Sequence, residues 1–308
     1  MDTFGKFKVA KFREKLARVE DEARVREERH VADMEDKWKK MANLEAEHAR
    51  QAAALAEQDA LSEHFAAFIR PKILANTHGG DGFLPALGTW YGDPRGAGSG
   101  GACGWADDVK SPPFSAMIAA GNAKIYLHGK GCGDCYQIKC NRRPYCSGNP
   151  ITVTITDECP GACNDVPFHF DLSGTAFGVM SSPGQADNLR NLGQVDIQYR
   201  RVPCNYGNTK IAFKIVAKTN PYWFATAIEF VDGVGEVKVV KIAQAGSKTF
   251  VPMYNSWGAV WAANINPPFP GPYSFLLTSP TNKTIMAYQV VPSNFVPGQT
   301  YYSHVNFY

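Results

Sequence analysis

Two aspartates at the ends of predicted strands are the side chains of this sequence best placed to do chemistry. Residues 152–156 alternate between apolar side chains and threonines, which predicts a half-buried strand that ends on Asp157. Residues 169–171 predict a second short strand, which ends on Asp171, and a turn with a cysteine at each end, 159–163, separates the two. We therefore expect both carboxyl groups on one rigid, hairpin-like unit.

A pair of carboxyl groups held by a sheet is what sugar-cleaving chemistry requires. One acid donates a proton to the leaving oxygen, and the other positions a water molecule or stabilises charge. An aspartate at the end of a strand is also a common turn former. The pair becomes a functional hypothesis only together with the rest of the chain.

The composition of the 308-residue chain favours a mainly β, loop-rich protein. It has 28 glycines and 20 prolines, and 12% of its residues are aromatic. This length allows two ordinary domains and an extension. A formal net charge of +3 does not indicate a nucleic-acid partner. No apolar run is long enough to span a bilayer, so we expect no transmembrane segment.

All eight cysteines lie between Cys103 and Cys204. Clustering of this kind in a β-rich region favours a disulfide framework that forms in an oxidising compartment. The alternative is a zinc site, in which Cys132 and Cys135 would be one half and the cysteines at 159 and 163 the other half.

Residues 1–70 form a strongly charged segment that we predict to be a helical extension. From Lys6 to Arg70 the chain has no glycine or proline, and apolar residues recur at three- and four-residue steps. The segment lacks the apolar core of a signal peptide, which conflicts with the disulfide framework. We interpret it as a foreign or mis-joined leader. Residues 71–86 are rich in glycine and polar turn formers, and we interpret them as a linker.

The C-terminal part of the chain predicts a β-sandwich. Short alternating segments separated by Gly, Pro and Asn turns are typical of this architecture. The predicted strands are 210–218, 229–231, 236–242, 273–277 and 284–290. Trp223 and Trp257 stand beside turns, and Asn282 begins a glycosylation sequon that applies to a secreted protein.

A series of short motifs resembles that of the plant expansins. The motifs are Thr89-Trp-Tyr-Gly, Gly101-Ala-Cys-Gly, Gly131-Cys-Gly-Asp-Cys, the strand at 152–157 and His169-Phe-Asp. The cysteine loop at 140–146 and the segment 256–261 further resemble the β-expansin branch. The resemblance covers about residues 87–308 and leaves out the N-terminal extension.

The resemblance implies a mainly β fold of two packed domains. Residues 87–204 would form a double-psi β-barrel similar to that of family-45 glycoside hydrolases. Residues 205–308 would form an immunoglobulin-like β-sandwich that acts as a carbohydrate-binding module. The helical extension is unrelated to either. The family's disulfides, carried over to this chain, would be Cys103–Cys132, Cys135–Cys204 and Cys140–Cys146, which leaves Cys159 and Cys163 close enough to pair with each other.

The resemblance also implies roles for the acids. Asp171 matches the general acid of the related hydrolases, whereas expansins lack a working base and do not hydrolyse their substrate. Asp93 lies four residues after Thr89, which is the spacing of the missing base, although Pro94 follows it. We therefore expect no catalytic residue in the strict sense, with Asp171 as a vestigial acid.

The expected function is non-hydrolytic loosening of the plant cell wall. A secreted monomer, glycosylated at Asn282, would bind xylan and cellulose and disrupt their non-covalent contacts, with no cofactor or metal. The expected polysaccharide-binding residues are Thr89, Trp90, Tyr91, Asp157, His169, Asp171, Trp223 and Trp257. One alternative is a weak inverting endoglucanase with Asp171 as acid and Asp93 as base. The other is an intracellular coiled-coil adaptor that carries a degenerate barrel.

Overall fold

The computed structural model describes residues 82–98, 101–220, 222–244, 246–265 and 271–307. The predicted helical extension and most of the predicted linker lie outside these residues. The first strand, β1, begins at Leu84, inside the last residues assigned to the linker. It starts there because Leu84 and Ala86 pack against the barrel core.

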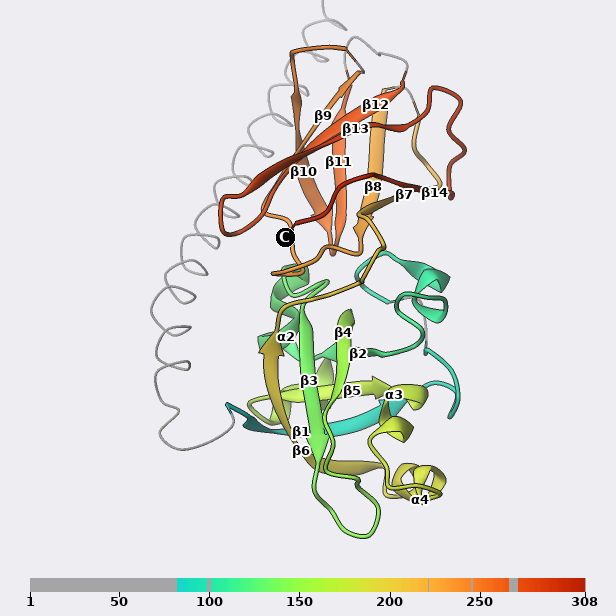
Figure 1. Cartoon of the computed structure of the whole chain (residues 1–308), viewed down its shortest axis with the longest axis vertical. Helices are drawn as coiled ribbons and strands as arrows, with labels where there is room; N and C mark the ends of the chain where they lie inside the picture. Colours follow the sequence, from blue (N-terminus) through green and yellow to red (C-terminus); the bar gives the residue numbers. More distant parts are fainter. Residues whose placement is uncertain (1–81, 99–100, 221, 245, 266–270, 308) are drawn as a thin grey trace, which may run out of the picture. The chain divides into compact units, whose positions relative to one another are not determined.

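The N-terminal half of the described chain is a closed six-stranded barrel in the order β1-β5-β2-β4-β3-β6 (Figure 1). Its strands are β1 Leu84–Tyr91, β2 Ile118–Gly121, β3 Cys135–Cys140, β4 Ile151–Glu158, β5 His169–Ser173 and β6 Gln194–Val202. Short helices connect them: η1 Ala106–Lys110, α2 Ala123–Tyr126, η2 Leu127–Gly129, η3 Gly161–Asp165, α3 Gly174–Val179 and α4 Ala186–Asn191. The sequence-based prediction of a mainly β fold with a double-psi β-barrel before the sandwich is confirmed.

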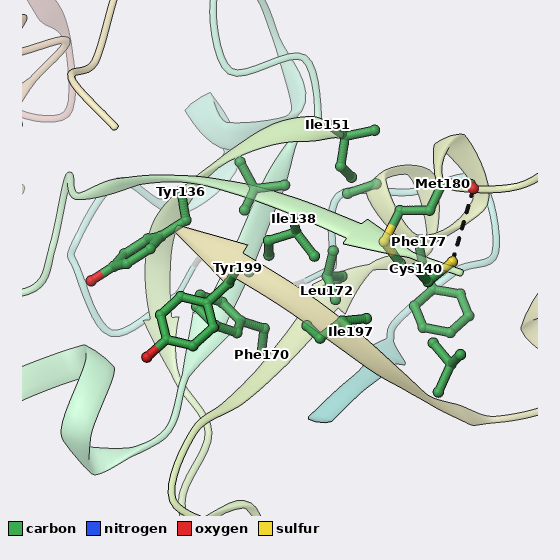
Figure 2. Packing of buried hydrophobic residues seen from close by; sticks show 14 of the residues in the cluster. Tyr136, Ile138, Cys140, Ile151, Phe170, Leu172, Phe177, Met180, Ile197 and Tyr199 are labelled. Carbon is green, nitrogen blue, oxygen red and sulfur yellow. Dashed lines mark hydrogen bonds between the residues drawn. The ribbon is translucent and has the colours of Figure 1, made fainter. Parts of the chain in front are cut away.

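Alternation along the strands separates the barrel core from its outer surface. On β5, Phe170 and Leu172 are fully buried, whereas Asp171 between them is partly exposed. Figure 2 shows these two apolar side chains among Ile138 from β3 and Ile197 from β6. The Asp171 side chain therefore projects from the outer surface of a closed and densely packed barrel.

The two acid-bearing strands do not form the hairpin-like unit that the sequence suggested. Strand β2 lies between them, parallel to β4 and antiparallel to β5. Alternation identifies which face of a strand is buried but does not identify its neighbour in the sheet. The two acids are therefore separated by one intervening strand.

The C-terminal half of the described chain is a β-sandwich that contains strands β7 to β14 (Figure 1). They are β7 Ala212–Ile215, β8 Trp223–Glu229, β9 Val239–Gln244, β10 Val251–Trp257, β11 Val260–Asn264, β12 Tyr273–Thr278, β13 Thr284–Val291 and β14 Thr300–Tyr302. The first part of β10 pairs with β9 and its second part pairs with β11, so this strand passes from one layer to the other. The prediction of a sandwich after the barrel is confirmed.

An indole from the barrel forms the centre of the contact between barrel and sandwich. Trp105 is 2% exposed and belongs to one buried cluster with Val260 of β11 and Ala225 of β8. Its Nε1–H donates to the carbonyl oxygen of Ile228 at 3.0 Å. Burial of an indole with its N–H satisfied is the arrangement that makes tryptophan a strong contact residue.

Two groups of charged side chains join barrel and sandwich around this apolar contact. Lys214 of β7 donates to the Trp105 carbonyl oxygen at 3.0 Å and forms an ion pair with Asp108 at 2.8 Å. Arg201 of β6 pairs with the buried Asp134 and lies 3.6 Å from Glu236 of the sandwich. Both groups place a cation beside a carboxylate, which compensates for the loss of hydration of the two charges.

Four disulfides join Cys103 to Cys132, Cys135 to Cys204, Cys140 to Cys146 and Cys159 to Cys163. This is the pairing implied by the resemblance. The alternative zinc site is wrong, because all of its sulfurs are bonded to other sulfurs and cannot act as thiolate ligands. Within the described ranges, no helix is long and apolar enough to cross a membrane.

Candidate functional site

The site begins with a row of residues across four neighbouring barrel strands. Thr89 of β1 lies opposite Asp171 of β5, and Asp171 lies opposite Ala120 of β2. Ala120 in turn lies opposite Asp157 of β4. We call these four residues the acid row. Because adjacent strands are about 4.8 Å apart, the backbones of the two aspartates are about 10 Å apart.

Asp171 is held on one of its two carboxyl oxygens. The Thr89 hydroxyl donates to Oδ1 at 2.5 Å, and the same hydroxyl lies 2.8 Å from Nε2 of His169. Burial raises the pKa of Asp171, while the hydrogen bond from Thr89 and the neighbouring His169 oppose the rise and the charge of Asp157 adds to it. The neutral carboxylic acid therefore persists to a higher pH than in an ordinary aspartate, and it can donate a hydrogen bond as well as accept one.

Asp157 is fixed by backbone donors. Its Oδ1 accepts from the N–H of Ala102 at 2.6 Å and from the N–H of Glu158 at 2.9 Å. The first of these bonds ties the aspartate to the backbone of Ala102, which follows β1 in the chain. The two acids therefore differ: Asp157 is anchored by amides, whereas Asp171 is anchored by a hydroxyl.

The neighbouring aromatic pair on β1 is divided between surface and core. Tyr91 is on the same side of the strand as Thr89, and its buried hydroxyl has a raised pKa because of burial and the charges of Asp157 and Asp171. Trp90 points the other way, packs against the barrel core and donates from Nε1 to the carbonyl oxygen of Arg190 at 3.0 Å. Alternation predicts that one of the two is in the core, and the structure places Trp90 there.

Three glycines that follow β1, Gly98, Gly101 and Gly104, contact the site closely because they lack side chains. A Cβ on Gly98 would come within 2.2 Å of the Tyr91 ring, and a Cβ on Gly101 within 2.2 Å of the Thr156 carbonyl oxygen. A Cβ on Gly104 would come within 3.0 Å of the Trp257 ring. Residues 101–104, which we call the connecting loop, thus run from Asp157 on the barrel to Trp257 on the sandwich.

Three aromatic side chains continue the site on the sandwich. Trp257 and Tyr254 of β10 are each 49% exposed, and the Tyr254 hydroxyl accepts from Nε1 of Trp223 at 3.2 Å. Strand register puts all three on one face, because Tyr254 lies opposite Ala262, Trp257 opposite Val260 and Trp223 opposite Asn264. We call Trp223, Tyr254 and Trp257 the aromatic platform.

Tyr254 and Tyr222, which precedes Trp223 in the chain and is 65% exposed, were not among the residues predicted for the site. A sequence signal for Tyr254 was available, because it follows the apolar Met253; on β10 the methionine is buried and both of its neighbours are exposed. Trp261 of β11, by contrast, is 9% exposed and belongs to the sandwich core.

The remaining predicted residues lie apart from the acid row or beneath it. The carboxylate of Asp93 accepts from the N–H of Arg95 at 2.8 Å, which is the role of a turn former. His169 is only 5% exposed, so its ring lies beneath the surface. Asn282 is exposed in the turn between β12 and β13, a position open to a glycan, and its modification stays a prediction.

Comparison with known proteins identifies both halves of the described chain. Residues 211–292 match the family model described as the expansin C-terminal domain, and residues 118–199 match the model described as lytic transglycolase. Expansin-B11 of Oryza sativa subsp. japonica is 47% identical over 230 residues, which is 73% of this chain and 78% of that protein. Expansin-B4 of Arabidopsis thaliana is 47% identical over 222 residues, which is 71% of this chain and 85% of that protein.

A solved structure has the same fold. A mutant of the Clavibacter michiganensis expansin, in complex with cellohexaose, aligns with a TM-score of 0.56 and 19% identity over 73% of this chain and 98% of that chain. At this identity the likeness concerns the fold, whereas the plant relatives establish the family. The chain belongs to the expansins, in the β-expansin branch, whose members loosen cell walls without acting as enzymes.

Proposed function

We propose that this protein loosens the wall by binding one polysaccharide chain along the acid row, the connecting loop and the aromatic platform. The observation that carries the proposal is the continuity of these parts. Asp157 is bonded to Ala102 of the connecting loop, and Gly104 of the same loop lies against Trp257 of the platform.

The two ends of this surface match different groups of a sugar, its polar oxygens at one end and its apolar ring faces at the other. Carboxyl and hydroxyl groups of the acid row match the hydroxyl groups and ring oxygens of a polysaccharide. The exposed faces of Trp257 and Tyr254 match the apolar C–H faces of pyranose rings, which stack on aromatic planes. A β-linked glucan or xylan offers both kinds of group along its length.

The physical basis of loosening in this proposal is differential binding. A ligand shifts an equilibrium only by as much as it prefers one state over the other. A surface that binds a separated, twisted polysaccharide segment more tightly than a packed one favours the release of contacts between polymers. The acids then serve as hydrogen-bonding groups, and no glycosidic bond is cut.

One solved relative supports the choice of cellulose as a ligand. The bacterial expansin was solved with cellohexaose, a fragment of cellulose. We propose cellulose and xylan as the polymers that this chain binds, a monomer as the working unit, and secretion into the cell wall with a glycan on Asn282.

The test is to remove the platform ring by ring. Trp257→Ala is expected to weaken binding to insoluble cellulose and xylan by about fivefold, the equivalent of about 1 kcal/mol for one lost ring contact. Trp223→Ala is expected to have a smaller effect, since this ring is only partly exposed. The matched control is Tyr288→Ala, an aromatic that is 54% exposed on β13, outside the platform.

Pull-down and wall extension would be measured for each variant, with near-ultraviolet circular dichroism as a check on folding. Wild-type binding by a folded Trp257→Ala variant would refute the proposal. Release of reducing sugar in proportion to wall extension would also refute it, because the protein would then be cutting its substrate.

A further inference from the structure

We propose that Thr89 and His169 are positioning residues that determine which oxygen of Asp171 carries its exchangeable proton. They do so as a directed hydrogen-bond chain, in which His169 donates to Thr89 and Thr89 donates to Asp171. This inference rests on the proposed function, because it concerns how the acid of the polysaccharide site is prepared. It also assigns His169 a role that does not require contact with sugar.

The backbone register brings the three side chains together. Strands β1 and β5 are parallel neighbours, with Leu87 opposite His169 and Thr89 opposite Asp171. Two residues apart on one strand, the histidine and the aspartate project on the same side. The Thr89 hydroxyl lies between them, 2.8 Å from Nε2 and 2.5 Å from Oδ1.

The number of available protons sets the direction of the chain. An ionised carboxylate only accepts hydrogen bonds, so Thr89 must donate its single proton to Asp171. The hydroxyl then offers only lone pairs to His169, and Nε2 must be the donor. A neutral imidazole carries one ring proton, which leaves Nδ1 unprotonated.

The burial of His169 supports a neutral ring independently. Its Nδ1 is buried and has no hydrogen-bond partner among the described residues. A second ring proton would create an N–H donor with no acceptor and a cation out of contact with water. Burial accordingly lowers the pKa of His169, against the opposing attraction of Asp171.

The consequence for Asp171 is an asymmetry between its oxygens. Oδ1 is kept as an acceptor, so an added proton goes to Oδ2. In the described part of the chain, the neighbour of Oδ2 within hydrogen-bonding range is Cys159 Sγ at 3.9 Å, and a disulfide sulfur has no proton to donate. The Oδ2 proton is therefore free to be donated to a polysaccharide oxygen.

The groups that face Asp171 from the neighbouring strands do not compete for this proton. Asp157 on β4 is separated from it by Ala120 and acts through its charge. Tyr91 on β1 is neutral, because its pKa is raised.

Nuclear magnetic resonance of the full-length protein tests the chain directly. The ring nitrogens of His169, assigned by their loss in His169→Gln, are expected to show a protonated Nε2 and an unprotonated Nδ1 while Asp171 is ionised. Thr89→Val keeps the side-chain size and removes the hydroxyl. It is expected to abolish the preference for the Nε2 proton and to raise the pKa of Asp171, whose ionised form loses a donor.

The matched variant is Thr89→Ser, which keeps the hydroxyl and is expected to restore both wild-type readings. The midpoint of wall extension against pH is expected to move upward in Thr89→Val and to stay in place in Thr89→Ser. A proton on Nδ1 in the wild-type protein, or a doubly protonated ring beside ionised Asp171, would overturn the proposal even if Thr89→Val does not fold. An unchanged Asp171 titration in folded Thr89→Val would overturn it too.

The resonance measurements are made without polysaccharide, so the hydrogen-bond chain and the proposed function can fail separately. A protein with the expected proton positions that neither binds polysaccharide nor extends walls would contradict the proposed function and leave the hydrogen-bond chain intact. A protein that extends walls with the opposite proton positions would contradict only the chain.

Discussion

Replacing Glu229 with glutamine is expected to remove a large pH dependence from the stability of this protein. Glu229 ends β8 and is 0% exposed, on the sandwich side of the contact with the barrel. Burial first, and then the charge of Asp108, raise the pKa of Glu229 from 4.5 to about 9, while Lys214 opposes the rise. The folded protein therefore holds this side chain in its neutral form.

The sign and size of the effect follow from the two pKa values. Between pH 4.5 and pH 9 the folded protein keeps a proton that the unfolded chain has lost, so the free energy of unfolding falls as pH rises. Each pH unit in this window corresponds to about 1.4 kcal/mol. Three units, from pH 5 to pH 8, therefore correspond to about 4 kcal/mol. Glutamine has similar shape and no ionisation, so it removes this contribution.

The assay is denaturant unfolding with the disulfides intact, at pH 5 and at pH 8. Glu229→Gln is expected to match the wild type near pH 5 and to exceed it by about 4 kcal/mol at pH 8. The control is Glu158→Gln, an exposed acid, which is expected to follow the wild type at both values. The reasoning is refuted if wild type and Glu229→Gln lose the same stability between the two pH values.

Three further predictions address the site itself. Gly104→Val places a branched side chain at φ +91°, where a Cβ alone would be 2.6 Å from the Val260 side chain of the sandwich. Pull-down by polysaccharide should therefore fall at least as far as in Trp257→Ala. Unchanged binding would contradict a role of the connecting loop in the site. Because burial raises the pKa of Asp171, wall extension should rise as pH falls through that pKa. Asp171→Asn should retain part of the wall extension with a flattened pH profile, and Asp171→Ala should lose it. Equal loss of wall extension in both variants, with release of sugar by the wild type, would indicate hydrolysis. Removal of residues 1–80 should leave binding and wall extension unchanged, since the proposed site begins at Thr89 on β1 and all its other residues lie later in the chain; loss of pull-down by the shortened protein would contradict this.

The sequence was sufficient to predict the elements that alternate and the residues that belong to the motif series. Residues 152–156 alternate, and they lie within β4. The acids were recognised because each stands at the end of a predicted strand, and the disulfide partners came from the resemblance to expansins. These features depend on short stretches of chain or on motifs that resemble those of the family.

The neighbours of each strand could not be predicted in the same way. Nothing in residues 118–121 indicates that β2 separates β4 from β5, because that pairing joins distant segments. Strand β8 is buried on both faces and therefore has no alternation to detect, so only its last residue fell within a predicted strand. The contact of Gly104 with Trp257 likewise depends on how barrel and sandwich pack.

The two charged groups between barrel and sandwich have a mechanical consequence. Lys214 of the sandwich holds Asp108 and the Trp105 carbonyl of the barrel, and Arg201 of the barrel, which pairs with Asp134, lies near Glu236 of the sandwich. With Trp105 packed between barrel and sandwich, these ties oppose bending of the barrel relative to the sandwich. In the proposed function, a polysaccharide that binds along both parts therefore meets a stiff surface and must itself bend to fit it.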